Sequence, residues 1–154
     1  MLIVPMTRTH ARHCDAIVAQ SEPWKTLGDG IDFAGAIRHK IGHVCLKNDR
    51  LAGFLIITPD PVFARGGYLR AIGVDPEMRG QGIGRALLAF AEELTAARAD
   101  FLYLCVSSFN RPAKHFYKKN GYARVGTLPG LVLPNTSEHI YWKRLQRTPR
   151  KTRK

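Results

Sequence analysis

The chain has 154 residues, the length of one ordinary domain, which excludes a multidomain protein. Its composition is 45% hydrophobic and 23% charged, with 14 glycines and nine prolines, and this excludes a disordered, collagenous or coiled-coil chain. The formal net charge of +12 predicts attraction to phosphates, anionic cofactors, nucleic acid or acidic surfaces.

Much of this positive charge lies at the C-terminus. Residues 143–154 hold seven basic residues and no acid, which leaves 17 basic against 12 acidic residues upstream, or +5. We expect residues 146–154 to form a basic, disordered tail and residues 1–145 to form one domain. No interleaving of basic and aromatic residues and no nucleic-acid motif accompanies the tail, so we infer no nucleic-acid partner.

The remaining composition predicts a cytoplasmic protein without a metal. The first six residues are too short an apolar stretch for a signal peptide or a membrane span, so we expect no membrane association. Cys14, Cys45 and Cys105 are odd in number and far apart, which predicts reduced thiols. No Cys-x-x-Cys or His-Glu-x-x-His pattern indicates a metal site.

In chain order, the first part predicts strands and short helices. Apolar residues recur at helical spacing between residues 11 and 18, and turn-forming Asn48 and Asp49 separate two apolar runs, which predicts a β-hairpin. The predicted elements are a strand at 2–6, a helix ending near residue 20, a loop at 21–30, a short helix at 33–38, and strands at 43–47 and 51–58.

The second part predicts a parallel β-α-β unit. The segment 82–98 carries the clearest helical pattern, with apolar residues at i, i+3, i+4, i+7, i+8 and i+11, and a nearly continuous apolar run follows it. Asn110 is a predicted N-cap of a further helix, which Gly121 ends. The elements are a loop at 59–67, strands at 68–74, 101–106, 122–125 and 139–143, and helices at 82–98 and 110–119.

The junction before the strong helix has the residues of an anion site. Gly80, Gly82 and Gly84 allow backbone N–H groups to converge at a helix N-terminus, and Arg79 and Arg85 add positive charge. A Walker loop is excluded because Lys-Ser or Lys-Thr does not follow the last glycine. A dinucleotide-binding fingerprint is excluded because the glycine spacing differs and the next strand ends without an acidic residue.

Two motifs together resemble those of the GCN5-related N-acetyltransferase (GNAT) family. The sequence RGQGIG at 79–84 matches the family's pyrophosphate motif, and NRPAKHFY at 110–117, followed by KKNGY, matches a second motif. The element order extends this resemblance over residues 1–145. It implies an α/β fold with a mixed, mostly antiparallel sheet of six to seven strands, a splayed parallel pair in its middle, and about four flanking helices.

The resemblance also implies the activity and its site. The expected function is acetyl-CoA-dependent transfer of an acetyl group to a primary amine of a small molecule, peptide or protein. The free strand edge at 72–74 would pair with the pantetheine arm, and Tyr117 would protonate the leaving sulfur. The implied cofactor-binding residues are Ile72, Gly73, Val74, Arg79, Gly80, Gln81, Gly82, Ile83, Gly84, Arg85, Asn110, Ala113 and Tyr117.

Several points stay open at the level of sequence. Glu22 and Glu138 are candidate general bases, and the alternative is a water chain that carries the proton to Ser107 or to a backbone carbonyl. Trp24 and Phe33 are candidate walls of the substrate pocket or core residues. A non-catalytic acyl-CoA sensor and an acetyltransferase anchored on nucleic acid by the tail are the alternative functions. Edge strands are compatible with a homodimer.

Overall fold

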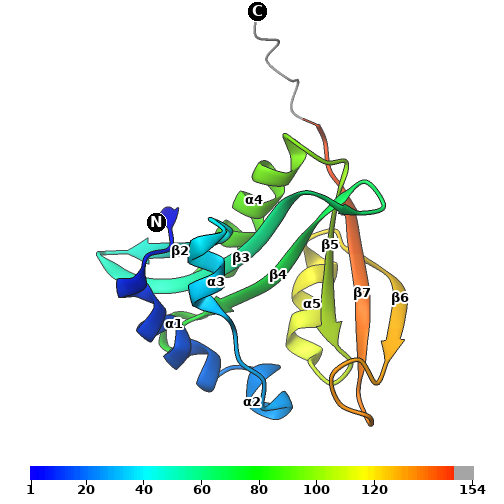
Figure 1. Cartoon of the computed structure of the whole chain (residues 1–154), viewed down its shortest axis with the longest axis horizontal. Coiled ribbons are helices and arrows are strands. Elements are labelled where there is room, and N and C mark those ends of the chain that lie inside the picture. The colour runs from blue at the N-terminus through cyan, green and yellow to red at the C-terminus, as the bar shows by residue number, and fades with distance from the viewer. Residues whose placement is uncertain (148–154) are drawn as a thin grey trace, which may run out of the picture.

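A computed structural model describes residues 1–147 (Figure 1). Within them, one seven-stranded sheet has the order β1-β2-β3-β4-β5-β7-β6. The parallel pair is β4 with β5, and every other neighbouring pair is antiparallel. The elements are β1 Leu2–Pro5, α1 Arg8–Ala19, α2 Trp24–Leu27, α3 Phe33–Arg38, β2 Gly42–Lys47, β3 Arg50–Phe63, β4 Gly66–Val74, a 3-10 turn Pro76–Met78, α4 Ile83–Ala96, β5 Phe101–Ser107, α5 Arg111–Lys119, β6 Ala123–Pro129 and β7 Ser137–Arg144.

Helices cover both faces of the sheet (Figure 1). Buried apolar side chains form one core on each face. On one face α4 buries its apolar stripe, including Leu87 and Ala91, against the central strands, together with Tyr117 from α5. On the other face, residues of α1 and α3 pack around Phe54 and Ile56 of β3. The predicted parallel β-α-β unit and the mixed sheet are therefore confirmed.

The parallel pair separates part-way along its length. Strand β4 pairs with β5 only from Gly66 to Leu69. Beyond that point β4 stays paired with β3 as far as Val74, and β5 stays paired with β7 as far as Ser107. The two strands are thus held by different neighbours and diverge, which leaves the β5-facing edge of residues 70–74 without a strand partner.

A bulge lies where this divergence starts. Leu69 pairs with Ile57 and Ala71 pairs with Ile56, so Arg70 is an extra residue in β4. Its effect is visible in the packing: Leu69 belongs to the core under α4, whereas Ala71 packs against the core on the opposite face. Residues two apart in a regular strand share a face, so the bulge reverses the facing of the strand.

The predicted loop at 59–67 is wrong, because most of it is strand. β3 continues to Phe63, and a tight turn at Ala64 and Arg65, with φ of 39° and 65°, leads directly into β4. Pro59 and Pro61 lack an N–H and concealed the strand from the sequence. The ladder is correspondingly irregular, with a register shift between Thr58 and Phe63.

The first residues of the basic C-terminal segment are part of the fold. Lys143 lies in β7 and its Nζ is 3.0 Å from both carboxylate oxygens of Glu92, and Arg147 Nε lies 3.0 Å from Asp100. The rest of the predicted tail, residues 148–154, lies outside the described residues. Among the residues described, no helix is long and apolar enough to cross a membrane, and no group of three His, Cys, Asp or Glu side chains could hold a metal ion.

Candidate active site

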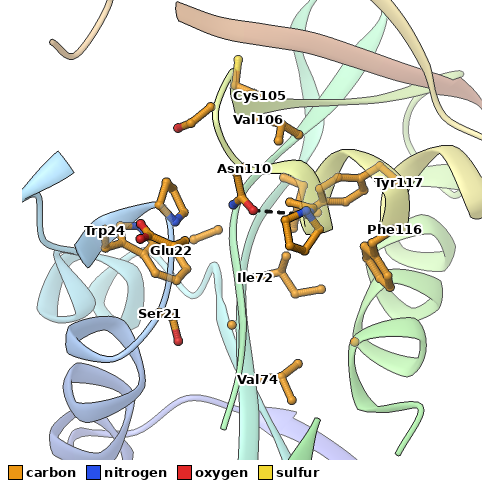
Figure 2. Close-up of a pocket in the computed structure, with 18 of the residues that line it drawn as sticks. Ser21, Glu22, Trp24, Ile72, Val74, Cys105, Val106, Asn110, Phe116 and Tyr117 are labelled. Atoms are coloured by element: carbon orange, nitrogen blue, oxygen red, sulfur yellow. Dashed lines mark hydrogen bonds between the residues drawn. The ribbon is translucent and has the colours of Figure 1, made fainter. Parts of the chain in front are cut away.

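A cleft of about 1100 Å³ opens where β4 and β5 separate (Figure 2). Its walls come from the free part of β4, the loop before α4, the end of β5, α5, the segment around α2, and the loop between β6 and β7. Pockets that hold one drug-sized ligand measure roughly 300–1,000 Å³. The cleft therefore lies just above this range and can hold a long, extended ligand.

The loop before α4 has the backbone of an anion cradle. Gly80 and Gly82 have φ of 74° and 79°, a left-handed conformation that side chains disfavour, and a Cβ built on either would meet nothing within 4 Å. Gly82 is also the N-cap of α4, where helical N–H groups lack intrahelical partners. These open amides and the helix dipole favour a phosphate group.

The side chains of this loop are divided between the cleft and the protein body. Arg79 lines the cleft and donates from Nη2 to Ser21 Oγ at 2.9 Å, and Arg85 also lines it. Gln81 turns away, accepting a 2.7 Å hydrogen bond from Lys47, and is not among the lining residues. Ile83 is buried, and its side chain belongs to the core beneath α4.

The free edge of β4 supplies the next part of the cleft. Ile72, Gly73 and Val74 line it, and Figure 2 shows Ile72 and Val74 along its length. A Cβ at Gly73 would lie 2.5 Å from the Phe54 ring, so glycine is required there by packing. Unpaired strand N–H and C=O groups suit an extended, amide-containing ligand.

Helix α5 presents Asn110 and Tyr117 to the cleft. Asn110 caps the helix, as predicted, by accepting from the Ala113 N–H at 3.3 Å (Figure 2). Tyr117 is 6% exposed, with its ring packed edge-on against Phe116. Burial, with a further contribution from Tyr68, raises the pKa of the Tyr117 phenol, so it stays protonated and can act as a donor.

The two candidate bases have different surroundings. Glu138 is buried in the cleft wall and accepts a 2.6 Å hydrogen bond from Ser107 Oγ. Glu22 is exposed, and its carboxylate accepts from the Thr26 N–H and hydroxyl at 3.1 and 2.7 Å. Glu22 is therefore engaged at the start of α2, whereas Glu138 lines the cleft opposite Ser107 at the end of β5.

The two aromatic candidates for the pocket wall lie in different places. Trp24 lines the cleft, as expected of a pocket wall. Phe33 does not: it is buried in α3, with its ring centroid 5.1 Å from that of Phe54, and it belongs to the core. The structure adds Tyr68, Arg70 and Cys105 as lining residues. No sequence motif marks them, because only the bulge and the splay bring them to the cleft.

Comparison with known proteins decides the family. The sequence pattern described as the Acetyltransferase (GNAT) family matches residues 9–122. The chain belongs to the GNAT family. The GNAT chain is an acetyl-CoA-dependent N-acetyltransferase, so its substrates are acetyl-CoA and an amine.

Individual relatives of this GNAT chain differ in how much they share with it. It is 33% identical to the N-alpha-acetyltransferase RimI of Mycobacterium tuberculosis, over 79% of this chain and 77% of that protein. It is 40% identical to the streptothricin acetyltransferase of Streptomyces lavendulae, but over 44% of this chain and 36% of that protein. The crystal structure of Ard1 from Thermoplasma volcanium shares its fold, with a TM-score of 0.78, 20% identity, and coverage of 94% and 97% of the two chains.

Proposed function

We propose that this GNAT enzyme acetylates the α-amino group of a peptide or protein, in preference to a small polycationic amine. The similarity to RimI supports this acceptor because it extends over most of both chains. The similarity to the streptothricin enzyme covers only 36% of that protein.

The observation that carries the proposal is the character of the cleft. Its rim is apolar at Trp24, Leu27, Leu131 and Val132, and Leu131 is 59% exposed. A polyamine or aminoglycoside needs complementary negative charge, whereas apolar peptide side chains suit this rim. The charged lining has five cations, Lys25, Arg70, Arg79, Arg85 and Lys119, against three carboxylates, Glu22, Asp29 and Glu138.

The cofactor side of the proposal uses the backbone of the cleft. The bound thioester supplies the acetyl group. The free edge of β4 at 72–74 pairs with the amides of the pantetheine arm, and the N–H groups of residues 79–84, with Arg85, hold the pyrophosphate. Asn110 and Ala113 at the start of α5 contact the more distant part of the cofactor.

Two side chains move the protons in this proposal. Tyr117 donates to the leaving sulfur, whose thiol has an ordinary pKa of about 8.5. Glu138 accepts a proton from the amine, oriented by the hydrogen bond from Ser107. An α-amino group has an ordinary pKa of about 7.7–8.0 and is partly neutral near pH 7.5, so it demands less of this base than a lysine with a pKa of about 10.4.

The test compares acceptors that differ in one amine. A lysine-free peptide with a free N-terminus, the same peptide with its N-terminus blocked and one lysine added, spermidine and an aminoglycoside are assayed by thiol release, with product masses recorded. We expect acetylation of the free N-terminus and little on the other three. Faster turnover of spermidine or the aminoglycoside would refute the peptide acceptor. Thiol release on none of them would favour the sensor function.

We also propose a cytoplasmic location for the enzyme. The three cysteines are free thiols within the described residues, which suits a reducing compartment. Cys14 and Cys45 are buried in the core as free thiols, without a disulfide bond. Fractionation of the native source would test the location.

A further inference from the structure

A second cavity of about 410 Å³ adjoins the cleft beneath α2 and α3. The two cavities share four lining residues, Trp24, Asp29, Arg70 and Ala71. The shared residues belong to α2, the loop that follows it and the bulge of β4, and none belongs to the glycine loop before α4. A chain that enters the cleft as acceptor can therefore extend into the second cavity.

The charged side chains that line the second cavity differ in whether they already have a bonding partner. Asp32 accepts from the Gly35 N–H at 2.8 Å as the N-cap of α3, and Asp29 accepts from the Gly30 N–H at 2.9 Å. Arg38 and Arg70 also line the cavity. Across residues 1–147, neither guanidinium has a carboxylate within salt-bridge distance. The formal charges of these four side chains balance, but within the same residues the two guanidinium groups are the members without a hydrogen-bond partner, and guanidinium groups favour carboxylates as partners.

The position of Arg70 in β4 sets the distance between its guanidinium group and a bound acceptor. Arg70 is the bulged residue at the start of the free β4 edge, two residues before Ile72. At about 3.3 Å per strand residue, this separates the two by roughly 7 Å. An extended peptide advances at most about 3.3–3.6 Å per residue, so its second or third side chain spans the same distance from the acetylated nitrogen.

We propose that the second cavity is a subsite for an acidic side chain at the second or third position of the acceptor peptide, held by Arg70 with Arg38. This inference rests on the proposed peptide acceptor and names its preferred class. Trp24 lines both cavities, so it lies where the subsite meets the apolar rim and would pack against the aliphatic part of the same peptide.

The experiment uses the full chain and peptides that differ in one side chain. Asp, Asn or Lys is placed in turn at positions 2, 3 and 4 of a lysine-free peptide, and kcat/KM is measured by thiol release. Charge-assisted hydrogen bonds predict that Asp exceeds Asn by about tenfold at position 2 or 3. Added salt should reduce this ratio, because part of the preference is electrostatic.

Variants test whether the arginines produce the preference. In Arg70→Gln the Asp-to-Asn ratio should fall toward one, and in Arg70→Glu the preferred peptide should change from Asp to Lys. Arg70 is exposed, so these changes leave the core intact. Arg8→Gln, an exposed arginine at the start of α1 that lines neither cavity, is the matched control and should keep the ratio.

Two results would overturn the subsite. One is a wild-type Asp-to-Asn ratio near one at every position on peptides that are acetylated, which would leave the peptide acceptor itself intact. The other is a ratio that survives both Arg70→Gln and Arg38→Gln. Failure to acetylate any free N-terminus would overturn the peptide acceptor and the subsite together.

Discussion

Replacing Tyr117 by Phe removes one oxygen atom from the cleft and keeps the aromatic packing. The ring centroids of Phe116 and Tyr122 lie 5.2 and 5.7 Å from that of Tyr117, and a phenyl ring preserves both contacts. The variant should therefore fold and bind acetyl-CoA with little change in affinity. Any loss of rate then measures the hydroxyl itself.

The size of the loss follows from the surroundings of Tyr117. A general acid usually contributes about 10²–10⁴ in rate. Burial raises the Tyr117 pKa further above the pKa of about 8.5 of the leaving thiol, so complete proton transfer to sulfur is unfavourable. We therefore expect a loss at the low end, about 100-fold in kcat, which corresponds to about 2.7 kcal/mol.

The assay is steady-state thiol release with the acceptor peptide, paired with calorimetric titration of acetyl-CoA. Tyr122→Phe is the matched control, because it removes a hydroxyl from the same aromatic cluster. The Tyr122 hydroxyl donates to Glu92 at 3.0 Å, and Tyr122 does not line the cleft. Its kcat should stay near the wild-type value. An unchanged kcat in Tyr117→Phe, or an equal loss in both variants, would refute the assignment of Tyr117 as the acid.

Three further predictions test the base, the loop and the response to pH. Glu138→Gln should lower kcat/KM by about 100-fold and Glu22→Gln only slightly, and the reverse order in steady-state kinetics would make Glu22 the base. Gly82→Ala should weaken acetyl-CoA binding by about tenfold, as measured by calorimetry. Gly28→Ala is the control, because Gly28 has a similar φ of 64° but does not line the cleft, and it should not weaken binding. Equal effects of the two changes would indicate general destabilisation. Burial lowers the pKa of His43 below its ordinary value of 6.5, and a hydrogen bond with the Ile41 backbone opposes this shift to a smaller extent. As the pH falls, His43 is therefore protonated in the unfolded chain before it is protonated in the folded protein, which favours unfolding. Urea unfolding should show stability falling below pH 6.5 with a shallower slope in His43→Phe, and equal slopes would contradict the assignment.

Local signals in the sequence predicted a large part of this fold. The apolar stripe of α4, the Asn110 cap and the turn at Asn48 and Asp49 each depend on neighbouring residues alone, and the structure confirms all three. The glycine loop also follows from local rules, since Gly80 and Gly82 adopt the left-handed conformations that favour glycine. The glycine loop, the start of α4 and the Asn110 cap all line the cleft.

Other features depend on long-range pairing and packing that no local pattern reports. The extension of β3 past Pro59 and Pro61 is decided by its pairing with β4. The assignment of Trp24 to the cleft and of Phe33 to the core is decided by how α2 and α3 pack against Phe54. Two aromatic residues nine positions apart carry the same sequence signal, and only their tertiary neighbours distinguish them.

The bulge at Arg70 connects the two sides of the cleft. The two residues that flank Arg70, Leu69 and Ala71, pair with the consecutive residues Ile57 and Ile56 and occupy opposite cores. Deleting Arg70 would make them adjacent, and adjacent residues of a regular strand face opposite sides, so their core contacts and their register with β3 would be kept. The packing of β4 therefore does not require the extra residue, although that residue starts the free edge and lines both cavities. Changes at position 70 should accordingly alter the cavities and leave both cores intact.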